Sequence, residues 1–233
     1  MRHSRSVLLI LAIVFSSVFT GGTIASAAPD SSFGSSDLDT HGCSAELVNN
    51  DWRLGPVTLS NQFPVGGQVK GYNRFGPLQP SEFLDKYWDP EARDGAGGFK
   101  YPPENGYVLD ANHQPIKHVA TFGIGTLLDR YGAPGGNFLA PADTAYAARS
   151  LPPSNLVLDN APETCNYHVY AVIKPLPAYQ GQIAPWFEQP GLGQQIELVT
   201  DLIPANPECG TFVNVSFLLC DKYISQVYPT ILQ

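Results

Sequence analysis

The chain has 233 residues, and its 13 basic and 21 acidic residues leave a formal net charge of −8 at pH 7. An acidic protein repels the phosphate backbone of nucleic acids, and no basic stripe is present, so we expect no nucleic-acid partner. The 21 prolines and 22 glycines argue against long helices.

Residues 1–27 have the features of a secretory signal peptide. Arg2 and Arg5 precede the apolar run Val7–Phe19, and Ala25–Ala27 supplies the small-residue pattern of a cleavage site. The run is shorter than the roughly 20 residues that span a bilayer, and no second long apolar stretch follows. We therefore expect a secreted, extracellular protein without a membrane span, and association with a cell surface remains open.

The remaining chain is expected to be one domain, residues 81–233, preceded by a small N-terminal extension, residues 28–80. Residues 28–40 are small and polar, which is typical of disorder, and the rest of the extension alternates short apolar pieces with turns. Ser81–Tyr87 follows a proline and is the best helix candidate, with Ser81 as the N-cap.

Short β-branched and aromatic runs between turn residues predict strands. The clearest is Tyr167–Ile173, which reads YHVYAVI. The other predicted strands are His118–Ile124, Thr126–Leu128, Ile196–Leu198 and Thr211–Leu219. Together these elements predict an α+β fold with a compact, mostly antiparallel β-sheet core, short helices and the small N-terminal extension.

Four cysteines lie beyond the signal peptide, and their spacing fits no zinc site: Cys43, Cys165, Cys209 and Cys220. An even count in a secreted chain predicts two disulfides, with three pairings open. Because Cys209 and Cys220 flank the predicted strand Thr211–Leu219, a disulfide-closed element there is one of the options. Asn214 begins an Asn-Val-Ser sequence, which is an acceptor for N-glycosylation.

The stretch Asp129–Gln195 carries the candidate functional residues. It contains two of the seven arginines and many aromatics, but neither a standard hydrolase triad nor a metal-ligand cluster. Basic residues are scarce after Lys117, so an anionic ligand bound in this half must use one of four side chains or backbone amides. The four are Arg130, Arg149, Lys174 and Lys222. We therefore predict a pocket for a phosphate-bearing, aromatic ligand.

Each arginine has two interpretations. Arg130, at the end of a predicted strand, can clamp a pyrophosphate with its planar guanidinium, or it can form a surface pair with Asp129. Arg149 can contact a second phosphate or a ribose, or it can be a solvated arginine that caps a short helix around Thr144–Arg149.

Three further side chains suit a flat, polar ligand. Tyr131 and Phe138 can stack on a ring. His168, within the strand YHVY, can hydrogen-bond to a substrate or transfer a proton, or it can be a half-exposed strand histidine.

Trp186–Gln195 is a glycine-rich approach to a strand, and glycines allow the backbone to come close to a ligand. Gln194 and Gln195 cannot titrate, but either side chain can orient a water or hold a ribose hydroxyl. The alternative is a turn with exposed glutamines.

Four motifs in this order and spacing resemble the tuberculosis necrotizing toxin domain family, and in particular its secreted fungal surface NAD glycohydrolases. They are LDRYGAPGGNFLAP, RSLPP, YHVYAVIKPLP and GQIAPWFEQPGLGQQ, with YWDP and YPPENGY upstream. The resemblance covers roughly Phe83–Leu198.

The resemblance implies hydrolysis of the bond between nicotinamide and ribose in NAD+ or NADP+, with the dinucleotide as substrate and no cofactor. The family lacks the glutamate usual in NAD-cleaving enzymes and has a glutamine at the key position. Carried onto this chain, the glutamine is Gln195, with Gln194 as the alternative register, and the supporting arginine is Arg130. We expect Gln195 and Arg130 to be catalytic and the following residues to bind substrate: Arg149, Tyr131, Phe138, His168, Trp186 and Gln194.

Other functions remain open at this stage. ADP-ribosyl transfer or cyclisation would use the same intermediate, and a secreted surface protein without catalysis would only bind a ligand. The resemblance also implies a homodimer and, in some relatives, calcium near the C-terminus. Because Asp221 is the only acid after Cys220 and calcium takes six to eight oxygens, we expect no calcium site there.

Overall fold

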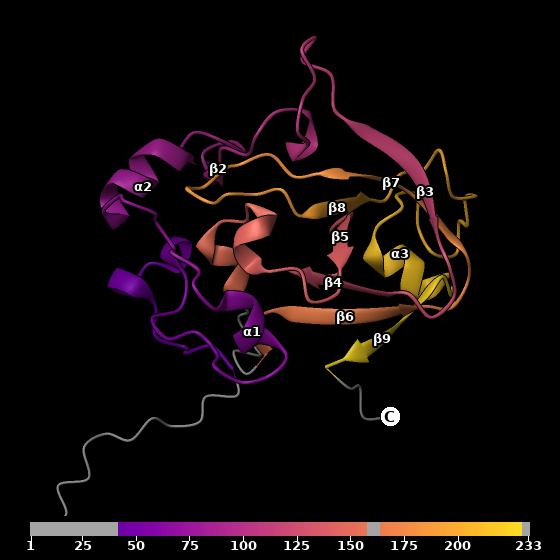
Figure 1. The fold of residues 1–233 in the computed structure, drawn as a ribbon, viewed down its shortest axis with the longest axis horizontal. Helices are drawn as coiled ribbons and strands as arrows, with labels where there is room; N and C mark the ends of the chain where they lie inside the picture. The colour runs from indigo at the N-terminus through magenta and orange to yellow at the C-terminus, as the bar shows by residue number, and fades with distance from the viewer. Residues whose placement is uncertain (1–41, 158–163, 230–233) are drawn as a thin grey trace, which may run out of the picture. The chain divides into compact units, whose positions relative to one another are not determined.

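The computed structural model describes residues 42–157 and 164–229, and these contain a seven-stranded antiparallel sheet. The predicted signal peptide and the predicted disorder of residues 28–40 lie outside the described residues. The strand order is β3-β7-β8-β5-β4-β6-β9, and every neighbouring pair is antiparallel (Figure 1). The strands are β3 (Lys117–Phe122), β4 (Leu127–Tyr131), β5 (Phe138–Pro141), β6 (Tyr167–Val172), β7 (Leu176–Gln182), β8 (Gln194–Glu197) and β9 (Ile224–Tyr228).

The helices are short, as the proline and glycine content predicts. The α-helices are α1 (Val65–Val69), α2 (Pro80–Tyr87) and α3 (Val215–Cys220). The 3-10 helices are η1 (Val48–Asn50), η2 (Trp52–Leu54), η3 (Glu104–Gly106), η4 (Tyr146–Arg149) and η5 (Pro153–Leu156), and a two-stranded ribbon pairs β1 (Trp88–Asp89) with β2 (Gly98–Phe99). The predicted α+β fold with a mostly antiparallel sheet and short helices is confirmed.

Helix α2 confirms the helix predicted over Ser81–Tyr87, but it begins one residue earlier. It begins at Pro80, whose fixed φ suits the first helical position. The backbone N–H of Gln79 donates to the Glu82 carboxylate at 2.7 Å, so Gln79 rather than Ser81 is the cap.

Strands β5, β7 and β9 were not predicted from the sequence. β7 contains Pro177 and Gly181, and β5 ends at Pro141, so neither shows the continuous β-branched pattern of YHVYAVI. Pairing with neighbours on both sides places β5 and β7 in the sheet despite these residues.

The predicted strand Thr211–Leu219 is wrong, because α3 lies there instead. The Asn214 side chain caps the helix by accepting the backbone N–H of Phe217 at 2.9 Å. An apolar run of this length fits a short buried helix as well as a strand, and the run alone cannot separate them. The Cys209–Cys220 disulfide closes this element and, together with Cys43–Cys165, it is the pairing that the structure shows among the three left open.

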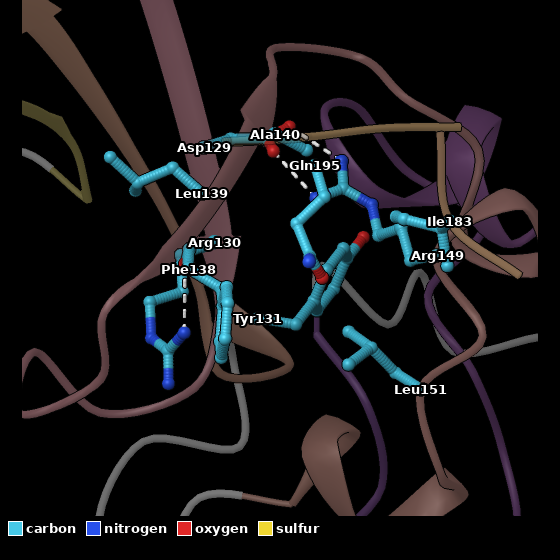
Figure 2. A pocket seen from close by; sticks show the side chains of 10 residues that line it. All are labelled: Asp129, Arg130, Tyr131, Phe138, Leu139, Ala140, Arg149, Leu151, Ile183 and Gln195. Carbon is cyan, nitrogen blue, oxygen red and sulfur yellow. Dashed lines mark hydrogen bonds and ion pairs between the residues drawn. The ribbon is translucent and has the colours of Figure 1, made fainter. Parts of the chain in front are cut away.

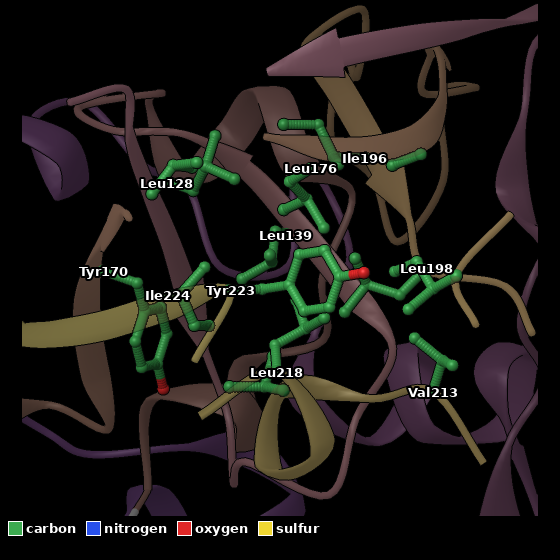
Figure 3. Close-up of a cluster of buried hydrophobic side chains, with 14 of the residues drawn as sticks. Leu128, Leu139, Tyr170, Leu176, Ile196, Leu198, Val213, Leu218, Tyr223 and Ile224 are labelled. Carbon is green, nitrogen blue, oxygen red and sulfur yellow. The ribbon is translucent and has the colours of Figure 1, made fainter. Parts of the chain in front are cut away.

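One face of the sheet packs against α3 and forms the larger hydrophobic core. Leu128, Leu139 and Ile196 come from three neighbouring strands, and they share one cluster with Ile224 of β9 and Leu218 of α3 (Figure 3). All five side chains are at most 3% exposed. Apolar packing on this face anchors the strands that carry the pocket.

The opposite face is covered by residues of the N-terminal segment. Val65 and Val69 of α1 pack with Tyr131 and Tyr167 of the sheet. The second disulfide, Cys43–Cys165, joins this segment to the residues just before β6 across 122 positions of sequence. Such a long loop is where a crosslink restricts the unfolded chain most. Cys43, Val65 and Val69 of this segment therefore form part of the core on this face of the sheet.

Within the described residues, none of the helices combines the length and the apolar character needed to cross a membrane.

The packing of α3 predicts a large difference between two phenylalanines that lie five positions apart in the same disulfide-closed element. Phe217 is 1% exposed and Phe212 is 77% exposed. Phe217→Ala should lower the free energy of unfolding by about 3–5 kcal/mol, because it leaves a cavity. Phe212→Ala should change it by less than about 0.5 kcal/mol. Urea unfolding of both variants measures this, and equal effects would show that α3 is not packed on the sheet as described.

Candidate active site

A small pocket lies on the sheet face that carries the N-terminal segment, and it brings together five of the predicted site residues (Figure 2). Its cavity volume is about 50 Å³. The lining residues are Asp129, Arg130, Tyr131, Phe138, Leu139, Ala140, Arg149, Leu151, Ile183 and Gln195. Because ligand pockets usually measure roughly 300–1,000 Å³, this cavity suits one end of a large ligand rather than all of it.

Strand order explains why residues distant in sequence meet here. β5 lies between β4 and β8, and its register places Ala140 opposite Asp129 and Phe138 opposite Glu197. Side chains two positions apart share a face of a strand, so Gln195 lies on the face of Glu197, and Gln194 lies on the other face. Gln194 does not line the pocket.

A buried ion pair between Asp129 and Arg149 forms the back of the pocket. Both arginine NH2 groups donate to the carboxylate, at 2.6 and 2.8 Å, and the two side chains are 0% and 4% exposed. The carboxylate also accepts the Tyr167 hydroxyl at 2.7 Å and the backbone N–H of Asp143 at 3.1 Å. Arg149 donates further to the Thr144 carbonyl. Every group of the pair is thus hydrogen-bonded.

Two further groups extend this network to α1. The Tyr131 hydroxyl donates to Gln68 Oε1 at 3.1 Å, and Arg149 donates to the same oxygen at 3.3 Å. The Arg149 guanidinium also lies 5.2 Å from the centre of the Tyr131 ring. The sequence did not indicate Gln68, because it comes from a separate segment with no motif.

The protonation of the pair follows from its geometry. Burial raises the pKa of the Asp129 carboxyl, although Arg149 and Tyr167 lower it. Burial lowers the pKa of the Arg149 guanidinium, but Asp129 raises it above the ordinary value of arginine. A raised pKa of Asp129 favours a proton on the carboxyl, whereas a raised pKa of Arg149 favours a charged guanidinium beside a carboxylate. Four donors are directed at the carboxylate and all need an acceptor, so Asp129 is ionised at neutral pH.

Arg149 is therefore neither a solvated helix cap nor a free cation. It ends η4, as the helix interpretation expected, but it is 5% exposed and its charge is matched by Asp129. The alternative pairing, a surface pair of Asp129 with Arg130, is wrong, because adjacent residues of β4 point to opposite faces.

Arg130 is held at the edge of the pocket by backbone carbonyls. Its Nε donates to Ala133 O at 2.9 Å, and one terminal NH2 donates to Phe138 O at 2.8 Å. A Cβ at Gly136 would collide with the guanidinium, so the glycine of this turn makes room for the arginine. In Figure 2 the guanidinium points away from the Asp129–Arg149 pair.

Arg130 has no carboxylate partner among the described residues. Burial lowers the pKa of its guanidinium, and the nearby hydroxyls of Tyr170 and Tyr101 raise it. A half-buried arginine without a counter-charge is an arrangement that an anionic ligand would complete.

His168 lies beside Arg130 rather than in the pocket. The two residues face each other across β6 and β4. Burial and the charge of Arg130 lower the pKa of His168 below 6.5, so the ring is neutral at neutral pH. Both ring nitrogens and the Tyr170 hydroxyl are buried without a hydrogen-bond partner in the described structure.

Trp186 belongs to a different cluster, next to α2. Its indole N–H donates to the Lys100 carbonyl at 2.7 Å, and its ring lies 6.0 Å from that of Tyr87. It does not line the pocket.

Gln195 is fixed by a neighbouring turn. Its Nε2 donates to the backbone carbonyl of Asn105, in η3, at 2.9 Å. An amide that donates through nitrogen on one side presents its oxygen as an acceptor on the other.

The described residues contain no group of three or more His, Cys, Asp or Glu side chains that could hold a metal ion.

Residues 121–227 match the family model described as tuberculosis necrotizing toxin. A curated relative is the conidial surface nicotinamide adenine dinucleotide glycohydrolase nadA of Aspergillus fumigatus, 47% identical over 156 residues. The match covers 67% of this chain and 66% of the relative, slightly less than two thirds of the relative's length.

Two solved structures show weaker likeness. The tuberculosis necrotizing toxin, solved with its immunity factor, shares 17% identity over 79% of this chain and 98% of its own, with a TM-score of 0.46. Tse6, solved with Tsi6, shares 21% identity over 42% of this chain and 77% of its own, with a TM-score of 0.26.

The buried pair predicts a stability difference between two arginines. Arg149→Met leaves the Asp129 carboxylate buried without its counter-charge and should cost about 3–5 kcal/mol of unfolding free energy. The matched change Arg53→Met removes a partly exposed pair with Asp51 and should cost no more than about 1 kcal/mol. Urea unfolding compares the two, and similar small losses would contradict the burial of the Asp129–Arg149 pair.

Proposed function

We propose that the chain is a glycohydrolase that cleaves the N-glycosidic bond between nicotinamide and ribose in NAD+. The observation that carries the proposal is the pocket itself, where Gln195 and Phe138 meet and the only carboxylate, Asp129, is bound by Arg149. The 47% identity to a conidial surface nicotinamide adenine dinucleotide glycohydrolase supports it.

The reaction suits a pocket whose carboxylate is not free to act. The pyridinium ring of NAD+ is cationic and departs as neutral nicotinamide, taking the electron pair of the C1′–N1 bond, so no general acid is needed. The ribose becomes oxocarbenium-like, as in other glycosyl hydrolyses. Water then forms the C1′–O bond and releases its proton to solvent. The protein must hold the ribose and place one water.

We assign the following roles to the pocket residues. The Gln195 Oε1 accepts a hydrogen bond from the attacking water or from a ribose hydroxyl. Phe138 packs on the nicotinamide ring. Tyr131 forms the wall beside the ribose, and Arg149 holds that wall in place through Asp129 and the Tyr131 ring.

Arg130 is proposed to bind the diphosphate. It is a half-buried cation that lines the pocket and has no acidic partner in the described residues, and its guanidinium matches phosphate oxygens. His168 and Tyr170, with unpaired polar atoms beside it, would add neutral hydrogen bonds to the same ligand. Trp186 and Gln194 would then contact only parts of the dinucleotide outside the pocket.

Secretion, N-glycosylation, use of NADP+ and a homodimer also remain proposals. The two disulfides support an oxidising, extracellular location. Asn214 uses its Oδ1 as the helix cap, which leaves its Nδ2 as the attachment atom for a glycan.

The two neighbouring glutamines provide the sharpest test of the site. Gln195→Ala should lower kcat for nicotinamide release at least about 100-fold, a loss typical of removing one hydrogen bond made in the transition state. Gln194→Ala, on the opposite face, should stay within about threefold. Initial rates with NAD+ measure both variants. A larger loss of kcat in Gln194→Ala than in Gln195→Ala would contradict the assignment of Gln195 to the reaction.

Product analysis of the wild-type reaction separates the alternatives. We expect equal amounts of nicotinamide and free ADP-ribose. A modified protein or a cyclic product in place of ADP-ribose would indicate transfer or cyclisation, and no nicotinamide release would indicate a binding protein without catalysis.

A further inference from the structure

We propose that Asn105 and Glu197, which do not line the pocket, are positioning residues that fix the side-chain amide of Gln195. This inference rests on the proposed function, because Gln195 matters only if its amide oxygen serves the reaction. The evidence is a chain of polar contacts that starts at Lys117 on the edge strand β3 and ends at the pocket.

The orientation of the Gln195 amide is determined by its partner. A backbone carbonyl can only accept, so the group that faces Asn105 O at 2.9 Å must be the NH2 of Gln195. The amide oxygen is then the atom left for the pocket that Gln195 lines. If the Asn105 carbonyl moved, the amide could rotate and present a donor instead of an acceptor.

The Asn105 carbonyl belongs to a turn that needs an anchor. Glu104, Asn105 and Gly106 all have left-handed backbone conformations, with φ of 49°, 56° and 80°. Such conformations cost roughly 1–2 kcal/mol for a non-glycine residue and persist only where the surroundings hold them. Asn105 is exposed, so water competes for its backbone groups.

Glu197 supplies that anchor from inside the sheet. The Asn105 Nδ2 donates to Glu197 Oε1 at 2.6 Å, a charge-assisted contact, and again the carboxylate can only accept. Glu197 is 4% exposed and lies two residues after Gln195, on the same face of β8. Asn105 is thus joined to β8 by two hydrogen bonds, one with the side chain of Glu197 and one with the side chain of Gln195.

Lys117 supplies the counter-charge for the buried carboxylate of Glu197. Its Nζ lies 2.8 Å from Glu197 Oε2, and 4.4 and 5.0 Å from the ring centres of Tyr179 and Tyr107. Gly181, between Lys117 and Gln195 in the register, leaves the space for the Tyr107 ring, since a Cβ there would lie 2.8 Å from that ring. Burying a carboxylate and an ammonium costs desolvation free energy that their attraction need not recover. The presence of the Glu197–Lys117 pair here therefore fits a positioning role.

A pair of variants at Asn105 tests the role. Asn105→Gly keeps a residue that tolerates the left-handed conformation and removes only the side-chain anchor. It should lower kcat about 10- to 100-fold with KM changed less than about threefold, because the amide is misplaced while the binding surface remains. Asn105→Asp places a carboxylate against Glu197 and should lower kcat in the same way.

The matched control is Asn49→Gly. Asn49 also lies inside a 3-10 helix with a left-handed backbone, φ 53° and ψ 25°, and it is exposed, but it is not part of the contact chain. Its substitution should leave kcat, KM and the melting temperature unchanged. A melting temperature for each Asn105 variant shows whether the protein is folded.

The second readout does not depend on activity. The side-chain NH2 signal of Gln195 is assigned in 15N spectra by its loss in Gln195→Ala, and its relaxation is compared between wild type and Asn105→Gly. We expect an ordered amide in the wild type and a mobile one in the variant. An amide that stays equally ordered in Asn105→Gly, with or without a loss of kcat, would overturn the inference.

Failure of the proposed function gives a different pattern. If the wild type released no nicotinamide, the glycohydrolase proposal would fail, and the order of the Gln195 amide would still decide whether Asn105 holds it. Full kcat in both Asn105 variants, with an active wild type, would reject the positioning role alone.

Discussion

The buried ion pair between Asp129 and Arg149 is the interaction on which the site depends. It joins β4 to the end of η4, and Arg149 donates a further hydrogen bond to Gln68 of α1, so three separate segments meet at one ion pair. Its members cannot be replaced singly, because a lone buried charge costs far more than the pair. The same contacts orient Tyr131, and the wall of the pocket is therefore set by polar geometry rather than by apolar packing.

The ion pair also accounts for the character of the proposed chemistry. Asp129, the only acid in the pocket lining, is occupied by Arg149 and Tyr167, so no carboxylate is free to act as nucleophile or base. What remains at the pocket surface is an amide, an aromatic ring and, at the edge, the unpaired Arg130. These groups bind and orient, which is sufficient when the leaving group departs as a neutral ring.

Much of this site could be predicted from the sequence, because its members lie in recognisable motifs between Asp129 and Gln195. The pairing of the charges could not. Asp129 adjoins Arg130 in sequence, yet the alternation of β4 sends them to opposite faces, and the true partner is 20 residues away. Asn105 lies in the upstream motif YPPENGY, but nothing in that motif indicates its contact with Gln195, which only the folded structure shows. The α+β class followed from composition and strand patterns, whereas α3 was missed because a short apolar run fits either element.

A crystal structure of the protein with a non-hydrolysable NAD+ analogue tests the central claim most directly. We predict that the nicotinamide packs on Phe138, that the Gln195 amide oxygen lies about 3 Å from a ribose hydroxyl or a water at C1′, and that the diphosphate lies within hydrogen-bonding distance of Arg130. A ligand bound elsewhere on the protein, or one whose diphosphate contacts Lys174 or Lys222 with Gln195 unengaged, would contradict it.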